Sequence, residues 1–581
     1  MTLSANTAAA DSIELRQSSE TPNQDLLGEL RNALPDEDVA ETAFEAKRQA
    51  RRAIKVIRDE LNAKGYYDPD IETLIEEDEV SEELFHPIVL LDPGMRFVLG
   101  ELAIAYIDKG PREADAIATR EAMKLQSGDD AIPAQVINQE TELVRTLREL
   151  GYAFVGAEDR SVIGDRDAGT LDVTYRLSSG PRVRFGEVRF VNDDTRTKES
   201  YLRRLIPFDE GELYDPAMLS LFAARLDETR LYRISNARLD DTSSGESVDG
   251  DEIYDVLVTL AERKRNTIEL GASYSTDKGA GLTSELTRRN LTRRGDLLVA
   301  SLAIAELEQI LEVQWRRPNE FGYGKGLIFG SELSNEDTDA FNRQTFSLSG
   351  GLEVVKGPRF SYGYGVKGSL VSEQDEFGER DLQIIGLYTK ARLDRADSIL
   401  NATKGWRVDG GLEPTVSFGS DSAQYIRAYG QLRGYYPVLD DGKVVLAGRV
   451  KAGTVWGADL EALPSTSRFF SGGGGSVRGY AYQGIGPRSD ADEPTGGRSV
   501  LELAFETRWQ VRGNIGVVAF LDAGSVTTRE IPGFSDLRTG AGFGVRYDTP
   551  AGPLRVDIAT PLDKTENDDP VQVYISLGQA F

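Results

Sequence analysis

The residues best suited to a specific interaction are an arginine in a glycine-rich loop and an aspartate in an apolar segment. Arg478 follows an unbroken run of glycine and serine (471–476) and precedes Gly479. A guanidinium can form a fork of two hydrogen bonds with a carboxylate. Asp522 lies within the strand-like segment 520–524 and is a candidate acceptor. The sequence therefore predicts an ion pair between Arg478 and Asp522, with a solvated arginine on a surface loop as the simpler alternative.

Residues that commonly do catalysis are scarce. His86 is the single histidine and stands beside Pro87, where a structural or solvated role is expected. The chain has no cysteine, which excludes disulfides and thiolate metal sites. A Gly-x-Ser-x-Gly nucleophile motif is broken at its last position in 474–478, and the glycines of 540–544 are not followed by a helical pattern. We therefore predict no enzymatic activity, no cofactor and no metal; a hydrolase linked to a barrel would need the missing motif.

Length and composition indicate a large, acidic protein rich in β-structure. A chain of 581 residues is expected to form at least two domains. Its 96 acidic and 67 basic residues give a net charge of −29, which argues against nucleic acid as a partner. The 59 glycines, 22 tyrosines and 22 phenylalanines favour an all-β region with many turns. No run of 18 apolar residues predicts a transmembrane helix, but alternating barrel strands would not produce such a run.

The first half of the chain contains a repeated unit. The segment 92–102 returns as 179–188, and in both a short strand is expected before a Gly-Glu pair and another strand after it. Apolar strands are predicted at 88–91, 171–175 and 254–260. Between the strands lie amphipathic helices, and Gly65 and Gly151 each follow the end of one, as is typical of a helix C-terminus.

The repeat predicts three small α+β domains, each with the order strand, helix, helix, strand, strand. Their expected bounds are 12–94, 95–180 and 181–265, behind a flexible remnant at 1–11 that has no complete signal peptide and is expected to follow a removed one. Three α+β domains of unrelated function are the alternative. Edge strands of such domains can accept a partner strand through main-chain hydrogen bonds.

The second half, 266–581, alternates apolar and polar residues in the manner of an antiparallel barrel. Ile268 and Leu270 alternate with polar neighbours, and Val573 and Ile575 do the same near the end of the chain. In a membrane barrel the apolar face meets lipid and the polar face lines the lumen. Sixteen strands are predicted to begin near Asn266, Ala280, Gly295, Gln309, Gly326, Arg343, Phe360, Arg380, Gly405, Ala423 and Lys443 before the glycine-rich loop, and near Arg498, Asn514, Leu537, Gly552 and Val571 after it.

A soluble β-sandwich and a passive porin share this alternation, but the motifs favour a different assignment. The phrase 468–480, with Val477, Arg478, Gly479 and Tyr480 at its end, resembles the inward-folded loop of the BamA/TamA outer-membrane protein insertase superfamily. The segment around Asp522 resembles the strand that receives the loop arginine in that family, and 540–557 resembles its late hairpin. The three repeats resemble polypeptide-transport-associated (POTRA) domains.

The resemblance spans nearly the whole chain, and three repeats with sixteen strands are most similar to the TamA-like members. It implies a location in the bacterial outer membrane, with the POTRA domains in the periplasm. It also implies unfolded outer-membrane proteins and autotransporters as clients, contact with outer-membrane lipid, and an inner-membrane-anchored, TamB-like protein as partner. A two-partner-secretion transporter remains an alternative, although the plugging helix of that class is not seen, and so does a passive channel.

An insertase of this kind needs a weak closing pair of strands, because a closed barrel offers no free edge. We predict this seam between the first strand, near Ile268, Leu270 and Gly271, and the last. A glycine weakens a strand, and each of these two strands carries one. The predicted seam residues of the last strand are Val573, Ile575, Gly578 and Phe581. An opened seam would let a client strand add to the barrel edge.

Overall fold

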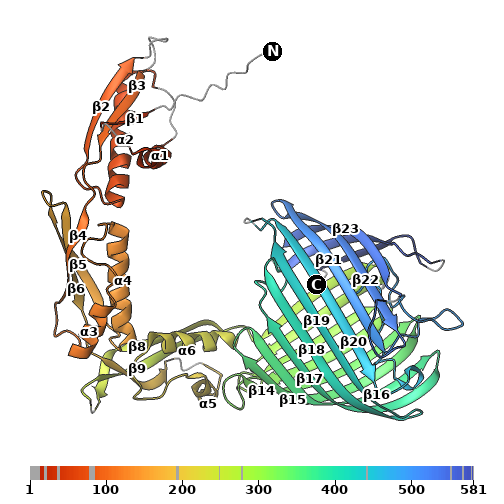
Figure 1. The fold of residues 1–581 in the computed structure, drawn as a ribbon. Coiled ribbons are helices and arrows are strands. Elements are labelled where there is room, and N and C mark those ends of the chain that lie inside the picture. Colours follow the sequence, from red (N-terminus) through yellow and green to blue (C-terminus); the bar gives the residue numbers. More distant parts are fainter. Residues whose placement is uncertain are drawn as a thin grey trace, which may run out of the picture. The chain divides into compact units, whose positions relative to one another are not determined.

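The structure of the chain is a computed structural model (Figure 1). It describes residues 13–18, 23–35, 40–77, 85–191, 195–247, 249–276, 279–439, 442–534, 536–549, 552–565, 568–577 and 579. The predicted remnant 1–11 lies outside these residues. The chain divides into two compact units, of which the first comprises Met1–Val191, Pro207–Ala224 and Asn236–Thr259. The second comprises Asn192–Ile206, Arg225–Ser235 and Leu260–Phe581.

Three small α+β domains occupy the N-terminal part, as the repeats predict. Each contains a three-stranded sheet, with the orders β1-β3-β2, β4-β6-β5 and β7-β9-β8. In each sheet the first strand runs parallel to the central one. The elements of the first domain are β1 (Glu14–Gln17), α1 (Gln24–Ala33), α2 (Ala43–Ala63), β2 (Asp70–Glu77) and β3 (Phe85–Asp92). Those of the second are β4 (Val98–Tyr106), α3 (Glu113–Glu121), α4 (Pro133–Glu149), β5 (Gly156–Asp165) and β6 (Thr170–Ser178). Those of the third are β7 (Val183–Phe190), α5 (Glu199–Leu202), η1 (Arg203–Leu205), α6 (Pro216–Glu228), β8 (Tyr232–Glu246) and β9 (Glu252–Glu262).

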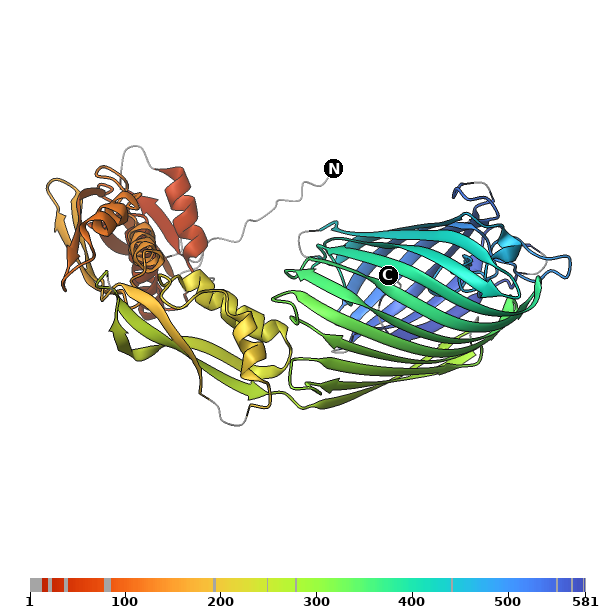
Figure 2. The ribbon, with the colours of Figure 1, turned by 90° about the horizontal axis from the view of Figure 1, so that it is seen from below.

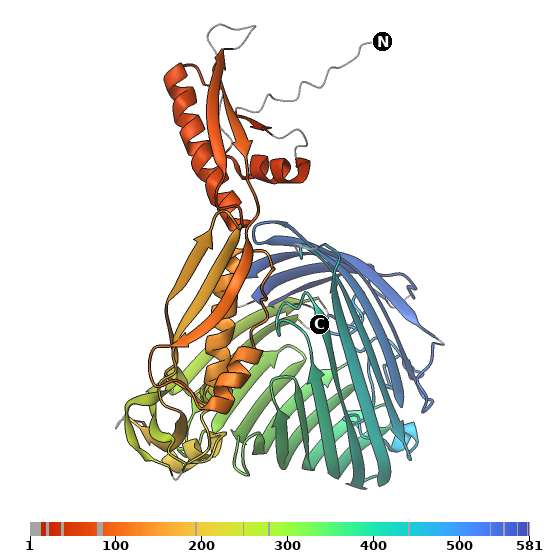
Figure 3. The same ribbon diagram turned by 60° about the vertical axis from the view of Figure 1, so that its left-hand side comes forward.

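The helices begin and end where the sequence supplies caps. The hydroxyl of Thr42 accepts a hydrogen bond from the N–H of Glu45 at the start of α2, and Pro133 opens α4. Gly65 and Gly151 follow α2 and α4 with φ of 90° and 100°, a left-handed conformation that glycine adopts without a Cβ clash. The buried face of α2 packs on the sheet of the first domain, along which the helix runs in Figure 3.

The sequence predicts one strand before each Gly-Glu pair of the repeat and another strand after it. This prediction is wrong. Each pair lies inside one continuous strand, at a bulge of β4 (Leu99/Leu102) and of β7 (Phe185/Val188). The N–H of Glu101 donates to a carboxylate oxygen of Asp172 (2.6 Å), and Glu187 donates in the same way to Asp255 (2.9 Å). An aspartate on the neighbouring strand therefore satisfies the N–H that the bulge removes from the ladder.

The second half closes into a barrel of sixteen antiparallel strands, which confirms the predicted fold class. Figures 1 and 2 show the tilted strands side by side around the barrel wall. All sixteen begin within two residues of the predicted positions. They are β10 (Asn266–Ser275), β11 (Gly279–Arg289), β12 (Leu297–Ala305), β13 (Glu308–Arg317), β14 (Lys325–Thr338), β15 (Phe341–Lys356), β16 (Phe360–Asp375), β17 (Gly378–Asp394), β18 (Gly405–Gly419), β19 (Ala423–Pro437), β20 (Val444–Trp456), β21 (Ser499–Arg512), β22 (Ile515–Thr527), β23 (Arg538–Thr549), β24 (Gly552–Pro561) and β25 (Gln572–Leu577).

The barrel wall has an apolar outer face and a polar inner face. Leu370, Ile385 and Leu387 are more than half exposed, whereas Glu373 and Arg380 on the same two strands are buried within the lumen. This arrangement is the one expected where the outer face meets lipid. Within the described residues, each helix is too short or too polar to cross a bilayer.

Candidate lumen loop and barrel seam

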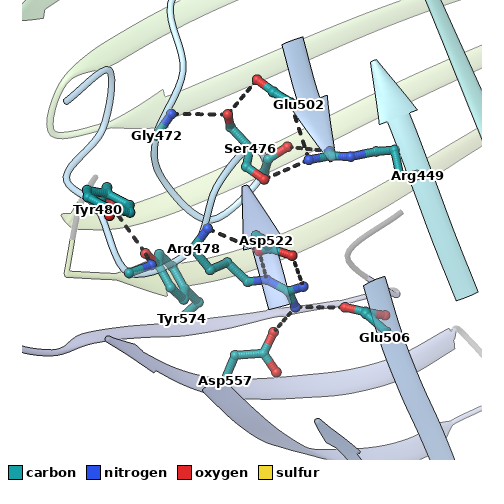
Figure 4. Close-up of polar contacts among 12 residues, drawn as sticks. Arg449, Gly472, Ser476, Arg478, Tyr480, Glu502, Glu506, Asp522, Asp557 and Tyr574 are labelled. Atoms are coloured by element: carbon teal, nitrogen blue, oxygen red, sulfur yellow. Dashed lines mark hydrogen bonds and ion pairs between the residues drawn. The ribbon is translucent and has the colours of Figure 1, made fainter. Parts of the chain in front are cut away.

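The loop between β20 and β21 folds into the lumen, and Arg478 is its most buried charge. The Nε and Nη2 atoms of Arg478 lie 2.7 and 2.9 Å from the two carboxylate oxygens of Asp522, in the expected fork (Figure 4). The backbone N–H of Arg478 also donates to Asp522 (3.1 Å). Because both side chains are about 1% exposed, the pair is screened little by water.

Two further carboxylates surround the same guanidinium. Nη1 of Arg478 lies 2.7 Å from Glu506 and 3.1 Å from Asp557, and the guanidinium carbon lies 3.5 Å from the ring centre of Phe520. Arg508 and Arg546 neutralise part of this acidic surrounding, through Glu506 (2.8 Å) and Asp557 respectively. We call Arg478, Glu506, Asp522 and Asp557 the clasp. It joins the loop to three strands, β21, β22 and β24.

Three glycines on the inner face of β23 leave room for the clasp. A Cβ at Gly540 would lie 2.0 Å from the carbonyl oxygen of Arg478, and one at Gly544 would lie 1.9 Å from a carboxylate oxygen of Asp557. A Cβ at Gly542 would lie 2.5 Å from the ring of Phe520. These glycines, which could be mistaken for a nucleotide-binding motif, permit close approach of the loop backbone to the barrel wall.

The residues after Arg478 attach the loop to the last strand. The N–H of Gly479 donates to the hydroxyl of Tyr574 in β25 (3.1 Å), and the hydroxyl of Tyr480 donates to the carbonyl of Thr539 (2.8 Å). Gly479 has φ of 102°, and a Cβ there would lie 2.8 Å from the backbone of Thr560. Val477 is fully buried. The four motif residues 477–480 thus all lie against the inner wall.

The loop is also attached to the barrel wall near its N-terminal end, at Arg468. The sequence did not predict this second attachment. Arg468 contacts Asp375 and donates to the carbonyl of Thr495 (2.8 Å). Arg380 lies 2.8 Å from both Glu373 and Asp375, and it also donates to the carbonyl of Glu461 (2.6 Å). These groups fix the start of the loop to β16 and β17.

Arg478 and Asp522 are the two members of the clasp that the sequence predicted; Glu506 and Asp557 were not predicted. Both are charged residues at inward-facing positions of alternating strands, which is the one sequence signal that could have indicated them. Their proximity to Arg478 depends on how the strands meet when the barrel closes. Alternation along a single strand does not indicate which strands meet.

Five of the seven predicted seam residues lie within the described part of the chain. Ile268 and Leu270 are 67% and 81% exposed on the outer face of β10, and Ile575 is exposed on β25. Gly271 lies in the ladder between β10 and β11, opposite Thr283, and Val573 pairs with Ile558 of β24. Gly578 and Phe581 lie outside the described residues.

Among the described residues, the ladder between β10 and β25 is the shortest in the barrel. It contains two pairs, Tyr274 with Ile575 and Ser275 with Tyr574. Thr276 adds a backbone hydrogen bond to the carbonyl of Val573 (3.0 Å). Ser273 and Ser576, the next residues in this register, are not paired. By contrast, all six residues of β25 pair with β24.

Beyond β25, Gln579 turns toward the lumen. Its side-chain amide donates to the side-chain oxygen of Asn401 (3.0 Å), and its oxygen accepts from Nε of Arg546 (3.1 Å). The side chain of Gln579 is thereby held by groups on the inner side of the wall.

Comparisons with known proteins agree with this architecture. The chain is similar to the outer membrane protein assembly factor BamA of Neorickettsia risticii, with 25% identity over 90% of the chain and 71% of that protein. It is 24% identical to BamA of Nitratidesulfovibrio vulgaris over 74% of the chain, and it spans 56% of that relative's length. The solved structure of BamA from Haemophilus ducreyi lacking POTRA domains 1–3 shares the fold, with a TM-score of 0.69, 18% identity, and coverage of 83% of this chain and 100% of that one.

The Omp85 superfamily domain matches residues 290–581, which are just over half of the chain. The match covers β12 to β25 and the lumen loop with its clasp. The protein is located in the outer membrane, and its N-terminal domains lie in the periplasm. By its barrel domain, the chain belongs to the Omp85 superfamily.

Proposed function

We propose that this protein assembles β-barrel proteins into the outer membrane through the seam between β10 and β25. The observation that carries the proposal is the two-pair ladder: β25 pairs along its whole described length with β24 but over two residues with β10. A sheet edge that lacks a partner can accept another strand through main-chain hydrogen bonds.

In this mechanism β10 supplies the edge for a client strand. Ile268 and Leu270 already present apolar side chains on the outer face of this strand. An added client strand in antiparallel pairing would satisfy the backbone groups of β10 that the described part of β25 leaves without a ladder. Such an exchange of strand pairing requires no covalent chemistry, and therefore no catalytic residues.

The N-terminal domains are proposed to capture partner and client segments at their sheet edges. Strands β2, β5 and β8 each pair with one neighbour in their sheets. The three-domain arrangement supports a TamA-like role within the superfamily, with autotransporters among the clients and a TamB-like, inner-membrane-anchored protein docked on these domains. A proline at Thr73 or Leu74 of β2 removes a main-chain donor, and is expected to weaken co-purification of the partner while leaving the barrel folded.

The seam is tested by a reversible lock. The native chain has no cysteine, so Tyr274→Cys with Ile575→Cys places one pair at the observed register. Paired antiparallel residues have Cα atoms within the roughly 7 Å that a disulfide spans. The lock is expected to stop insertion of a client barrel into proteoliposomes, and reductant is expected to restore it.

A matched lock belongs in a ladder that should not open. Phe346→Cys with Leu370→Cys joins β15 to β16, which pair over sixteen residues. This variant is expected to insert clients at the rate of the cysteine-free protein in either redox state. If the lock at 274 and 575 forms fully and insertion continues unchanged, the proposed role of the seam is wrong.

A further inference from the structure

The base of β10 adjoins a cavity whose lining is mostly cationic. The cavity has a volume of about 300 Å³, and its charged lining consists of five cations and one carboxylate: Arg196, Arg263, Lys264, Arg265, Arg289 and Glu262. All six belong to the unit that contains the barrel. A local excess of positive charge is unexpected in a chain of net charge −29, so these residues require an explanation.

Within the described part of the chain, the side chains of these cations form no ion pair, although the backbone N–H of Arg196 donates to the carboxylate of Glu262 (2.7 Å). Among the described residues, no carboxylate lies within 4.0 Å of a charged nitrogen of any of the five. Their side-chain contacts are to neutral oxygens: Nε of Arg263 donates to the carbonyl of Tyr232 (2.7 Å), and Nη1 of Arg289 donates to the hydroxyl of Thr267 (2.6 Å). Nε of Arg265 is buried, and no hydrogen-bond acceptor lies within reach among the described residues. A buried charged donor without an acceptor is costly.

The two earlier joints between repeats show what is different here. Arg96 caps the end of α2 by donating from Nε to the carbonyl of Lys64 (2.9 Å), and its guanidinium is paired with Asp130 (2.6 Å). Arg182 caps α4 in the same way at Leu150 (3.1 Å), with Asp115 at 3.8 Å.

Arg263 donates to a carbonyl beyond the end of α6, that of Tyr232 in β8, but in the described part of the chain no aspartate lies within 4.0 Å of its guanidinium. The backbone N–H of Arg289 donates to the carbonyl of Arg265 (2.8 Å), so two arginines stand across from each other at the start of the ladder between β10 and β11. Like charges directly opposite each other destabilise a strand pair. An anion bound between them would remove this repulsion.

We propose that this cavity binds a phosphate group. Arginine forks match the oxygens of phosphate, and four arginines with one lysine can hold a group that carries more than one negative charge. A phosphate there would take the place that Asp130 and Asp115 occupy at the earlier joints. The site lies immediately before β10, so its occupancy stabilises the base of the seam strand. The inference does not depend on the proposed function.

Two sources could supply the phosphate. Inorganic phosphate could enter from the periplasm. A phospholipid headgroup could reach the site because Ile268 and Leu270, just beyond it in β10, present apolar side chains on the outer face. The shared chemistry is a phosphate held by guanidinium forks, and an experiment with two arms separates the sources.

The experiment uses the full chain folded in dodecyl maltoside micelles at low salt. The first arm measures binding of radiolabelled inorganic phosphate by equilibrium dialysis. The second follows the thermal unfolding midpoint after addition of phosphatidylglycerol or of diacylglycerol with the same acyl chains, which lacks the phosphate. The site variant is Arg263→Gln with Arg265→Gln. Its affinity for phosphate is expected to fall about tenfold or more, because charge-assisted hydrogen bonds are lost.

A matched control removes two arginines that each contact a carboxylate. Arg204 and Arg294 both contact Glu320, at 3.2 and 3.3 Å. Arg204→Gln with Arg294→Gln lowers the net charge equally and is expected to leave phosphate binding within about twofold of the unchanged protein. If the site variant does not fold, Lys264→Gln, at an exposed position, provides a milder test, with an expected loss of about threefold.

Each result has one meaning. Loss of phosphate binding in the site variant alone supports the proposal and identifies free phosphate as a ligand. A midpoint raised by phosphatidylglycerol but not by diacylglycerol, and only while the arginines are present, supports it and identifies a headgroup. Binding of neither probe, or equal binding by the site and control variants, overturns it.

Discussion

The barrel wall differs on the two sides of β25: many interactions connect the strands on one side, β21 to β24, and few connect β25 to β10 on the other. On the side of β21 to β24, the clasp places three carboxylates around Arg478, and each strand pairs along its length. On the side of β10, two pairs and the contacts of Thr276 form the described ladder. Among the described residues, the barrel therefore has more interactions beside the seam than within it. A wall that opens at one edge needs rigid neighbours if the rest of the barrel is to stay closed.

Removing the clasp should weaken the side of β21 to β24 and so reduce its difference from the side of β10. This is the largest loss of stability that we expect. Arg478→Ala leaves Glu506, Asp522 and Asp557 buried without their shared cation. Breaking a buried ion pair by removing one partner costs roughly 3–5 kcal/mol. The variant is expected to unfold at lower urea concentration and to accumulate as unfolded barrel, measured by the heat-modifiable mobility of the folded form on gels.

Asp522→Asn provides the control for this prediction. It keeps the shape of the side chain but loses the charge of the fork, so a smaller loss is expected because Glu506 and Asp557 remain beside Arg478. The double variant should cost less than the sum of the two single ones, since they share one interaction. Additive losses would show that the arginine and the aspartate act independently.

Tyr574→Phe tests whether the clasp region also positions the seam strand. The hydroxyl of Tyr574 accepts the N–H of Gly479 and lies 3.5 Å from the carbonyl oxygen of Tyr480, so it links the motif 477–480 to β25. Its loss should lower stability by about 1 kcal/mol, as for one buried hydrogen bond. It should also change the rate of crosslinking between Tyr274→Cys and Ile575→Cys. An unchanged crosslinking rate would mean that the loop does not position the seam.

Much of this contrast could be predicted from the sequence, because it depends on alternation along single strands. Strand positions, the inward loop, the fork of Arg478 with Asp522 and the outward Ile268 and Leu270 all follow from local pattern or from motif resemblance. The additional partners Glu506 and Asp557, and the second attachment at Arg468, depend on which strands meet across the lumen. The bulge at Gly100 was missed for a similar reason, since its N–H is satisfied by Asp172, a residue of another strand.

Lengthening the ladder between β10 and β25 should have a smaller effect on stability and on client insertion. Ser273 and Ser576 would be the next pair in the register and face the lumen. Threonine pairs across strands contribute about 0.2–1 kcal/mol, so Ser273→Thr with Ser576→Thr is expected to raise the unfolding midpoint slightly and to slow client insertion. The control is Ser347→Thr with Ser369→Thr, an inward pair within the sixteen-residue ladder of β15 and β16. Slower insertion in both variants would point to a general effect of threonine.

The smallest effect is expected at an exposed carboxylate outside the barrel, where uncharged donors hold the carboxylate in contact with water. Asp108 accepts from the N–H groups of Gly180 (2.8 Å) and Gly110 (2.9 Å) and from the hydroxyl of Ser178 (2.9 Å). Burial acts to raise its pKa, but these donors outweigh it and lower the pKa to about 2.

A carboxyl group whose pKa is lower in the folded state stabilises the fold above its unfolded pKa and loses that contribution as the pH falls through the folded value. For Asp108 the contribution is complete above about pH 4 and disappears toward pH 2. Hydrogen exchange at the amides of Gly110 and Gly180, corrected for the intrinsic rate, should therefore accelerate over this interval. In Asp108→Asn the exchange is expected to be fast at every pH and to lose its pH dependence, because the amide oxygen is a weaker acceptor than the carboxylate. A variant that keeps both the slow exchange and its pH profile would show that Asp108 does not hold these amides.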